Sequence, residues 1–151
     1  MFLAVGKLRP AYRAACDEYR RRLCRYVEVR EAEVRQAGRA GSATAERREE
    51  ARRLGAQLPD RAQLIVLARD GTGWTSAQLA GQLERWRLAA RPVVFVLGGS
   101  QGLDPELLRS ADARWSLGPL TLPHELARVV AYEQIYRAFT ILRGEPYHKG
   151  K

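Results

Sequence analysis

Hydrophobic positions in this chain follow two periods, one typical of β-strands and the other of α-helices. Short apolar runs predict three buried strands: Met1–Val5, Gln63–Ala68 and Val93–Leu97. The last run is continuous, as expected for a central strand of a parallel sheet. Two weaker strands are expected, one over Val27–Val34, where valines alternate with charges as at a sheet edge, and one over Trp115–Leu117.

Apolar residues at helical spacing lie between the strands. The expected helices are Ala11–Tyr26, Thr44–Leu58, Thr75 to about Trp86, a short helix opening at Asp104-Pro105, and Pro123 to about Arg143. Thr75 with Gln78 predicts a capping box, and Asp104 before Pro105 predicts a capped start. The remaining segments are predicted to be a polar loop over Gln36–Ala43, a turn at Asp70-Gly71 and a terminal tail over Gly144–Lys151.

The alternation of strands and helices predicts one α/β domain over residues 1–151, with a mainly parallel sheet flanked by helices. No apolar run approaches the roughly 20 residues of a membrane span. The apolar start has neither a charged leader nor a cleavage site, so it is interpreted as a strand and not as a signal peptide. We therefore expect a cytoplasmic protein without membrane contact.

Charge points to a polyanionic partner. Lys and Arg number 26 against 17 Asp and Glu, a formal net charge of +9, and cations bind nucleic acid by releasing its counterions. The alternative is a general preference for arginine. The Arg20–Arg25 surface could contact such a partner or form a solvated helix face. Cys16, Cys24 and the two histidines make no zinc pattern, so no metal is expected.

Three glycines follow the predicted central strand in "FVLGGSQG", Phe95–Gly102. Parallel sheets bind ligands at the carboxyl ends of their strands, and glycine lets a ligand approach the main chain. A tight strand-to-helix turn is an equally good explanation of these glycines alone. A dinucleotide fingerprint after the first strand and a Walker lysine are both missing, so NAD and ATP sites are not expected.

A second stretch, "SLGPLTLP" over Ser116–Pro123, contains no charged residue. Leucines and backbone groups suit an adenine, whose faces are apolar and whose edge forms hydrogen bonds. Neither stretch brings the cluster of lysines or arginines that a triphosphate requires. An adenosine that carries a sulfonium amino acid fits this balance best.

The stretches "AVGKL", "FVLGGSQG" and "WSLGPLTLPHELARVVAYEQIYRAFTILRGEPYHK" closely resemble the RlmH family of SPOUT-class methyltransferases. The resemblance covers nearly the whole chain and is weakest around Gln36–Leu58. It implies a C-terminal trefoil knot, which is a rare exception to unthreaded topology, and a homodimer with the active site at the subunit interface. It also implies S-adenosylmethionine-dependent methylation at N3 of a pseudouridine in 23S ribosomal RNA, near the decoding centre of the assembled ribosome.

The same motif match implies a set of cofactor residues, in which Gly99 and Gly102 shape the turn. The set is Leu67, Gly98, Gly99, Gly102, Leu117, Gly118, Pro119, Leu120, Thr121 and Leu122. Because the sulfonium already activates the methyl group, catalysis is mainly a matter of alignment. The N3 proton must also leave, with help from a base or from a cation that stabilises the anion.

Catalytic candidates lie in the last predicted helix and the tail. Arg128 and Arg137 could hold phosphate or uracil carbonyls, although Glu133 and Arg137 also suit a helix-surface ion pair. By position alone His148 is a solvated bystander, but the match to the family's terminal "YHK" implies that Tyr147 stacks on a base and that His148 approaches the target. His124 is expected to be structural.

Two other functions remain open at this point. One is a SPOUT methyltransferase that acts on another RNA, such as transfer RNA or a ribose hydroxyl. The other is a basic ribosome-binding factor with a vestigial cofactor pocket. The absence of an appended RNA-binding domain favours a preassembled substrate, the ribosome, over free RNA.

Overall fold

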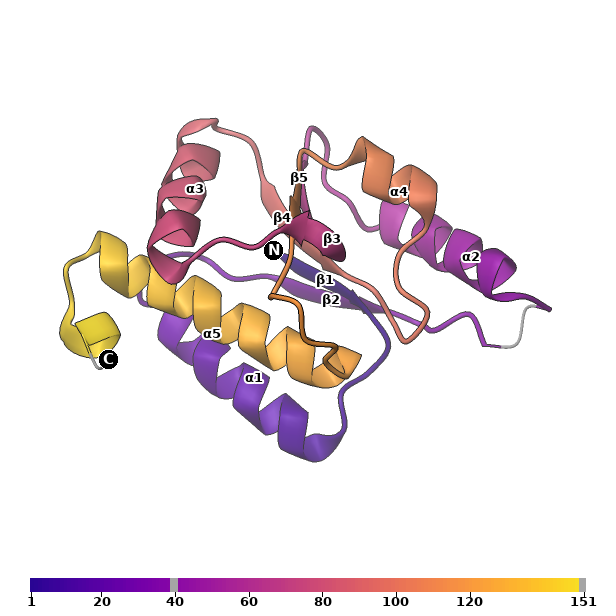
Figure 1. Ribbon diagram of the computed structural model, residues 1–151, viewed down its shortest axis with the longest axis horizontal. Coiled ribbons are helices and arrows are strands. Elements are labelled where there is room, and N and C mark those ends of the chain that lie inside the picture. Colours follow the sequence, from indigo (N-terminus) through magenta and orange to yellow (C-terminus); the bar gives the residue numbers. More distant parts are fainter. Residues whose placement is uncertain (39–40, 150–151) are drawn as a thin grey trace.

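The computed structural model describes residues 1–38 and 41–149, and in this part of the chain five strands form one sheet between two layers of helices (Figure 1). The strands are β1 (Phe2–Val5), β2 (Glu31–Val34), β3 (Gln63–Thr72), β4 (Val93–Leu97) and β5 (Ala113–Trp115). Their order is β2-β1-β4-β3-β5, and every neighbouring pair is parallel. The predicted α/β class with a parallel sheet is confirmed.

Helices cover both faces of the sheet. They are α1 (Pro10–Leu23), α2 (Ala43–Gly55), α3 (Ser76–Leu88), α4 (Pro105–Ser110), α5 (His124–Leu142) and the 3₁₀ helix η1 (Pro146–Lys149). Helices α1, α3 and α5 pack on one face, and α2 and α4 on the other (Figure 1). None of the helices in the described residues combines the length and apolarity needed to cross a membrane.

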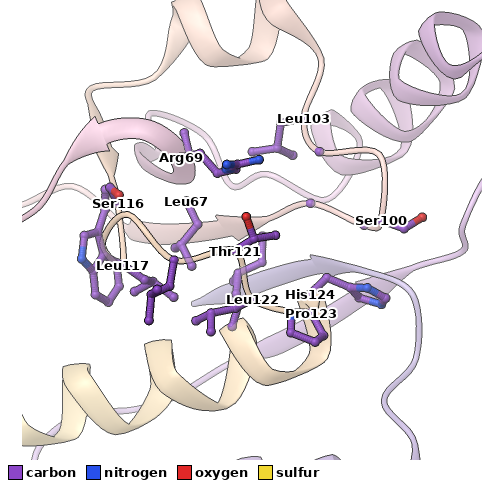
Figure 2. A pocket seen from close by; sticks show the side chains of 18 of the residues that line it. Leu67, Arg69, Ser100, Leu103, Ser116, Leu117, Thr121, Leu122, Pro123 and His124 are labelled. Atoms are coloured by element: carbon purple, nitrogen blue, oxygen red, sulfur yellow. The ribbon is translucent and has the colours of Figure 1, made fainter.

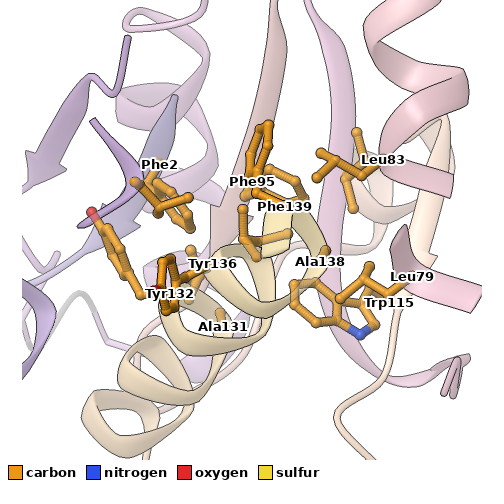
Figure 3. Close-up of a cluster of buried hydrophobic side chains, with 14 of the residues drawn as sticks. Phe2, Leu79, Leu83, Phe95, Trp115, Ala131, Tyr132, Tyr136, Ala138 and Phe139 are labelled. Atoms are coloured by element: carbon orange, nitrogen blue, oxygen red, sulfur yellow. The ribbon is translucent and has the colours of Figure 1, made fainter. Parts of the chain in front are cut away.

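Strand β4 shows why the sheet is buried on both faces. Phe95 and Leu97 join the core beneath α1, α3 and α5, whereas Val94 and Val96 join the core beneath α2 and α4. Successive strand residues point to opposite faces, so a continuous apolar run fills two cores at once. On the first face aromatic rings dominate, with Phe2, Phe95 and Trp115 of the sheet set against α5 (Figure 3).

The predicted helix starts at Thr75 and Asp104 are confirmed. The Thr75 side chain accepts from the Gln78 N–H at 3.2 Å, and the Gln78 side chain accepts from the Thr75 N–H at 2.9 Å. Asp104 caps α4 by accepting from the Glu106 N–H at 2.9 Å, with Pro105 as the first helical residue. These side chains satisfy amide groups that the helix itself leaves unpaired.

The predicted turn at Asp70-Gly71 is wrong, because β3 continues through it to Thr72. Beyond an irregularity after Leu67, Thr72 pairs with Trp115 of β5. A Cβ added at Gly71 would lie 2.7 Å from the carbonyl carbon of Arg114. The glycine is therefore needed for the close approach of two strands, and not for a turn.

Other differences are shifts of element ends. Helix α1 ends at Leu23, three residues before the predicted Tyr26, and β2 begins only at Glu31, although its predicted edge position is correct. Strand β5 ends at Trp115, which leaves Leu117 in the loop. Within the predicted tail, η1 packs on α5. Residues 39–40 of the predicted loop and 150–151 of the tail lie outside the described residues, and the trefoil knot stays a prediction from the resemblance.

Candidate functional site

A cavity of about 390 Å³ lies at the carboxyl edge of the sheet (Figure 2). Three segments line it: the end of β3 from Leu67, the turn after β4, and the connection from β5 into α5. All predicted cofactor residues except Pro119 belong to the lining. Segments that are far apart in the sequence thus meet around one space, which we call the carboxyl-edge cavity.

The glycine turn brings main chain against main chain. Gly102 has a φ of 77° and donates its N–H to the carbonyl oxygen of Gly99 at 3.1 Å. A Cβ on Gly98 would lie 2.9 Å from the carbonyl carbon of Gly102, and one on Gly99 would lie 3.1 Å from Cγ1 of Val5. Side chains at Gly98 and Gly99 would therefore disturb the turn, and the tight turn and an exposed main chain occur together here.

The uncharged loop is held by Ser116, the first residue of the stretch, which is not among the predicted cofactor residues. The Ser116 hydroxyl accepts from the Gly118 N–H at 3.1 Å, while Gly118 has a φ of 115°. This local bond fixes the start of the loop, so that Leu117, Thr121 and Leu122 lie along the cavity (Figure 2). A serine two residues before a glycine is a usual signal for such a bond.

Further lining residues were also missed by the sequence reasoning. They are Ala68, Arg69, Leu97, Ser100, Leu103, Trp115, Ser116, Pro123, His124 and Ala127. Arg69 directly follows the predicted strand, Pro123 is the last residue of the uncharged stretch, and His124 directly follows it. Adjacency to those two segments was the signal that could have identified them.

The chemistry of the carboxyl-edge cavity suits a nucleoside without phosphates. Leu67, Leu97, Leu117 and Leu122 offer apolar surface for a flat ring, and among the described residues Arg69 is the single arginine or lysine in the lining. A triphosphate would need several cations. Among residues 1–38 and 41–149, no group of three or more His, Cys, Asp or Glu side chains is placed to hold a metal ion.

Beside the cavity, the first turn of α5 is bonded to the segment that follows β1. Glu125 accepts from the main-chain N–H and from Nε of Arg9, both at 2.7 Å. These bonds, led by the one from the Arg9 main chain, lower the pKa of Glu125 below its ordinary value of 4.5. The contact sets where α5 begins and so where the uncharged loop must end.

Arg128 makes the second link between α5 and β1. Its guanidinium donates to the Gly6 carbonyl oxygen at 2.8 Å, to that of Val5 at 3.3 Å and to Glu33 at 2.5 Å, and the residue is 2% exposed. In this chain Arg128 is therefore a structural anchor. Its burial within one chain does not support contact with a phosphate or a uracil carbonyl, and that role stays a prediction.

The other catalytic candidates gather on the second half of α5. Arg137 donates to Glu133 at 2.7 Å, which confirms that the i, i+4 ion pair forms, and Tyr147 donates to the same Glu133 oxygen at 3.0 Å. The Arg137 guanidinium lies 4.9 Å from the Tyr147 ring centroid. Burial, followed by hydrogen bonding, raises the pKa of Tyr147 above its ordinary value. Nδ1 of His148 is buried and has no hydrogen-bond partner among the described residues.

One chain does not bring these candidates to the cavity. The lining reaches Ala127 on α5, whereas Tyr147 packs against Tyr136 with ring centroids 4.7 Å apart. Ala127 and Tyr136 are nine residue steps apart on α5, which corresponds to about 14 Å along the helix axis. Tyr147 and His148 are not part of the lining.

The Arg20–Arg25 surface is partly neutralised. Arg21 and Arg22 donate to Glu18 at 2.6 and 2.7 Å, and the Arg22 guanidinium also lies over Tyr19. Cys16 and Cys24 are both free thiols. Burial raises the pKa of Cys16 to about 11, so this thiol is a packing residue and not a reactive one.

Comparison with known proteins gives one consistent result. A family model described as "Predicted SPOUT methyltransferase" matches residues 1–148. The "Ribosomal RNA large subunit methyltransferase H" of Rubrobacter xylanophilus is 49% identical over 154 residues, covering 97% of this chain and 95% of its own. The proteins of the same name from Anaeromyxobacter sp. strain Fw109-5 and Pseudomonas fluorescens are 45% and 41% identical, each covering 97% of both chains.

A solved structure shares the fold. It is described as a probable methylase family protein from Haemophilus influenzae Rd KW20 and superposes with a TM-score of 0.56 over 97% of this chain and 68% of that one. The two sequences are 11% identical. The likeness therefore concerns the arrangement of strands and helices alone.

Proposed function

The chain belongs to the SPOUT methyltransferase family, and from this premise we propose that it methylates N3 of a pseudouridine in 23S ribosomal RNA on the assembled ribosome. Enzymes of this family use S-adenosylmethionine. The relatives described above are named as large-subunit ribosomal RNA methyltransferases, and the match covers at least 95% of each of them. The observation that carries the proposal is the carboxyl-edge cavity, in which Leu67, the glycine turn and the uncharged loop surround one phosphate-free space. Because ribosomes are the proposed substrate, we infer that the protein acts in the cytoplasm.

The residues of this cavity fit S-adenosylmethionine. Leucines supply apolar surface for the adenine, and the main chain of Gly98 and of the Leu117–Leu122 loop supplies groups for its polar edge. When bound, the cofactor provides an electrophilic methyl group on its sulfonium. The protein contributes alignment, because a displacement by N3 requires the acceptor to stand in line with the bond that breaks.

The second task of the site is to remove the proton from the acceptor nitrogen. N3 of pseudouridine carries a proton, which a base must accept or whose loss a cation must favour. We assign this environment to the tail and α5, where His148 has an unpartnered ring nitrogen and Arg137 stands beside Tyr147. We propose that Tyr147 stacks on an unstacked base.

A homodimer is the simplest way to unite the two halves of the site. Within one chain about 14 Å of helix separates the cavity lining from the contacts of Tyr147, so the tail of one protomer is proposed to complete the cavity of its partner. Mixing two inactive variants tests this arrangement. His148→Ala removes the tail group, and Gly118→Val places a β-branched residue at a φ of 115° in the loop.

Mixed dimers of these variants contain one intact site, because one protomer supplies the wild-type cavity and the other supplies the wild-type tail. We expect the mixture to recover methyl transfer that neither variant shows alone. If cavity and tail work within the same chain, mixing gives no more than the sum of the two variants.

The reaction itself is tested on ribosomes from a strain that lacks this gene. Incubation with S-adenosylmethionine, followed by mass spectrometry of ribosomal RNA fragments, should place one methyl group on N3 of a pseudouridine. A methyl group on transfer RNA or on a ribose hydroxyl would contradict the proposed target. If calorimetry detects no cofactor binding and no methyl transfer occurs, the remaining function is that of a basic ribosome-binding factor.

A further inference from the structure

A second cavity, of about 650 Å³, opens at the amino edge of the sheet, opposite the carboxyl-edge cavity. Met1, Phe2, Val93 and Phe95 contribute to its lining from the starts of β1 and β4. Strand β4 thus touches this amino-edge cavity with Val93 and the other cavity with Leu97. Parallel sheets place substrate and cofactor sites at the carboxyl edge, so the cofactor proposed above does not account for this space.

The floor of the amino-edge cavity is apolar and aromatic. Phe2, Phe95, Leu83 and Phe139 form it, and their side chains lie together in the core (Figure 3). Its walls come from three connections between elements and contribute Val27, Val29, Leu58, Pro59 and Pro92. Val27 is 38% exposed, one of four large apolar side chains so placed in the described residues. The floor side chains are only 3–4% exposed, so the accessible apolar surface is mainly that of the walls, which suits a flat, uncharged ring.

Cations surround the apolar part. Arg30, Arg87 and Arg91 belong to the lining, and Glu28, its single acidic residue, pairs with Arg30 at 3.0 Å. The Arg87 guanidinium lies 5.3 Å from the Phe139 ring centroid and forms no ion pair with any described residue. Arg91 is fixed by donating to the carbonyl oxygens of Arg61 and Ala62 at 3.0 and 2.9 Å.

An apolar slot edged by arginines matches a nucleotide of single-stranded RNA. Bases stack on aromatic and apolar side chains, and guanidinium groups bind phosphate with two parallel hydrogen bonds. We propose that the amino-edge cavity is an RNA-anchoring site that receives one unstacked base of the ribosomal RNA, with Arg87 as the main phosphate contact. The proposal rests on the proposed function only in taking ribosomal RNA as the substrate.

The position of the site gives it a distinct task. Four residue steps along β4 separate Val93 from Leu97, about 13 Å, so the anchored nucleotide is not the one that is methylated. The formal net charge of +9 attracts RNA without selecting a register. A base held in the amino-edge cavity fixes the register of the RNA relative to the methylation site.

Arg87→Ala tests the proposal, with Arg85→Ala as its matched control. Both arginines lie on α3, and Arg85 lines neither cavity. We expect Arg87→Ala to weaken binding of the assembled ribosome about tenfold and to lower the slope of log affinity against log salt by about one. S-adenosylmethionine affinity and the melting temperature should match those of Arg85→Ala. Equal RNA affinities and salt slopes for the two variants would overturn the proposal.

A crosslinking experiment locates the base independently of that variant. With wild-type protein and RNA containing 4-thiouridine, crosslinked peptides should come from residues 27–30, 57–59 and 87–93. Crosslinks that avoid all three segments would count against the site. Saturable binding of uridine 5′-monophosphate with no effect of Arg87→Ala on RNA affinity would indicate a free-nucleotide site, and altered sedimentation of Arg87→Ala would indicate a subunit contact. Both results overturn an RNA anchor.

These experiments measure RNA binding and not turnover, so they test the RNA-anchoring site separately from the proposed methyl transfer. If wild-type protein binds ribosomes through Arg87 but transfers no methyl group, the proposed function fails and the anchor stands. If methyl transfer occurs while Arg87→Ala binds RNA like Arg85→Ala, the anchor fails and the proposed function stands.

Discussion

Gly98 and Gly102 lie against each other in the turn after β4, so closely that a Cβ on Gly98 would stand 2.9 Å from the Gly102 carbonyl carbon. Side-chain carbons do not approach main-chain atoms to that distance. The turn therefore depends on the absence of a side chain at position 98, independently of any ligand.

Gly98→Ala should force the turn apart and reshape the carboxyl-edge cavity. We expect a loss of stability of about 1–3 kcal/mol, as for other overpacked sites, and at least tenfold weaker binding of S-adenosylmethionine by calorimetry. Gly81→Ala is the control, because Gly81 lies in α3 with open space around its Cβ position. That change should stabilise the protein by roughly 0.5–1 kcal/mol. Similar behaviour of the two variants in urea unfolding would contradict the packing argument.

His148→Ala should separate catalysis from cofactor binding. Since general acid–base groups contribute roughly 100- to 10,000-fold, we expect at least a hundredfold lower turnover on ribosomes with unchanged cofactor affinity. His124→Ala is the comparison, because His124 lines the carboxyl-edge cavity. It should weaken cofactor binding while turnover at saturating cofactor is retained. Normal turnover by His148→Ala would remove this residue from the mechanism.

Arg128→Ala should be among the most destabilising substitutions in α5. The change leaves the carbonyl groups of Val5 and Gly6 without their buried donor and takes one partner from Glu33. Glu33 is partly exposed and keeps Arg13 as a partner, so the main cost is the loss of the buried donor to main-chain carbonyl groups, about 1–3 kcal/mol. Arg21→Ala, which removes an exposed pair with Glu18, should cost about 1 kcal/mol or less. Urea denaturation followed by circular dichroism measures both, and equal effects would show that burial adds nothing.

The Glu125–Arg9 contact should make stability depend on acid pH. The pKa of Glu125 is lowered in the folded state, chiefly by the Arg9 main-chain N–H, below the ordinary value of 4.5. A lowered carboxyl pKa stabilises the fold fully above the unfolded-state value, and this contribution disappears as the pH falls through the folded-state value.

Glu125→Gln should therefore be less stable than the wild type at pH 7, and the difference should shrink as the pH is lowered below about 4.5. Unfolding curves of both proteins at several pH values provide the measurement. A difference that stays constant with pH would mean that the carboxylate charge is not what stabilises this contact.

Features governed by neighbouring residues could be predicted from the sequence. The capping box of Thr75 and Gln78 depends on residues three apart, and β4 is recognisable because its apolar run must be buried on both faces. The glycine turn and the uncharged loop likewise stood out by local composition, whereas their union in one cofactor site was implied by the family resemblance; the structure places both along one cavity.

Features governed by distant partners could not be predicted. Asp70-Gly71 has the composition of a turn, yet pairing with β5 keeps it extended. An arginine in a helix is ordinarily expected at the surface. Arg128 is buried because it contacts the segments around β1 and β2, which local sequence does not reveal. The packing of Tyr147 on α5 depends on a reversal of the chain after Gly144, which has a φ of 67°.

The links from α5 to the segment around β1 have a consequence for folding. Arg9 bonds to Glu125, and Val5 and Gly6 bond to Arg128, so these contacts join residues 116 to 123 positions apart. Strand β1 also needs β4 as a neighbour. Contacts of such large sequence separation require long loops to close before they stabilise the fold, which favours slow folding.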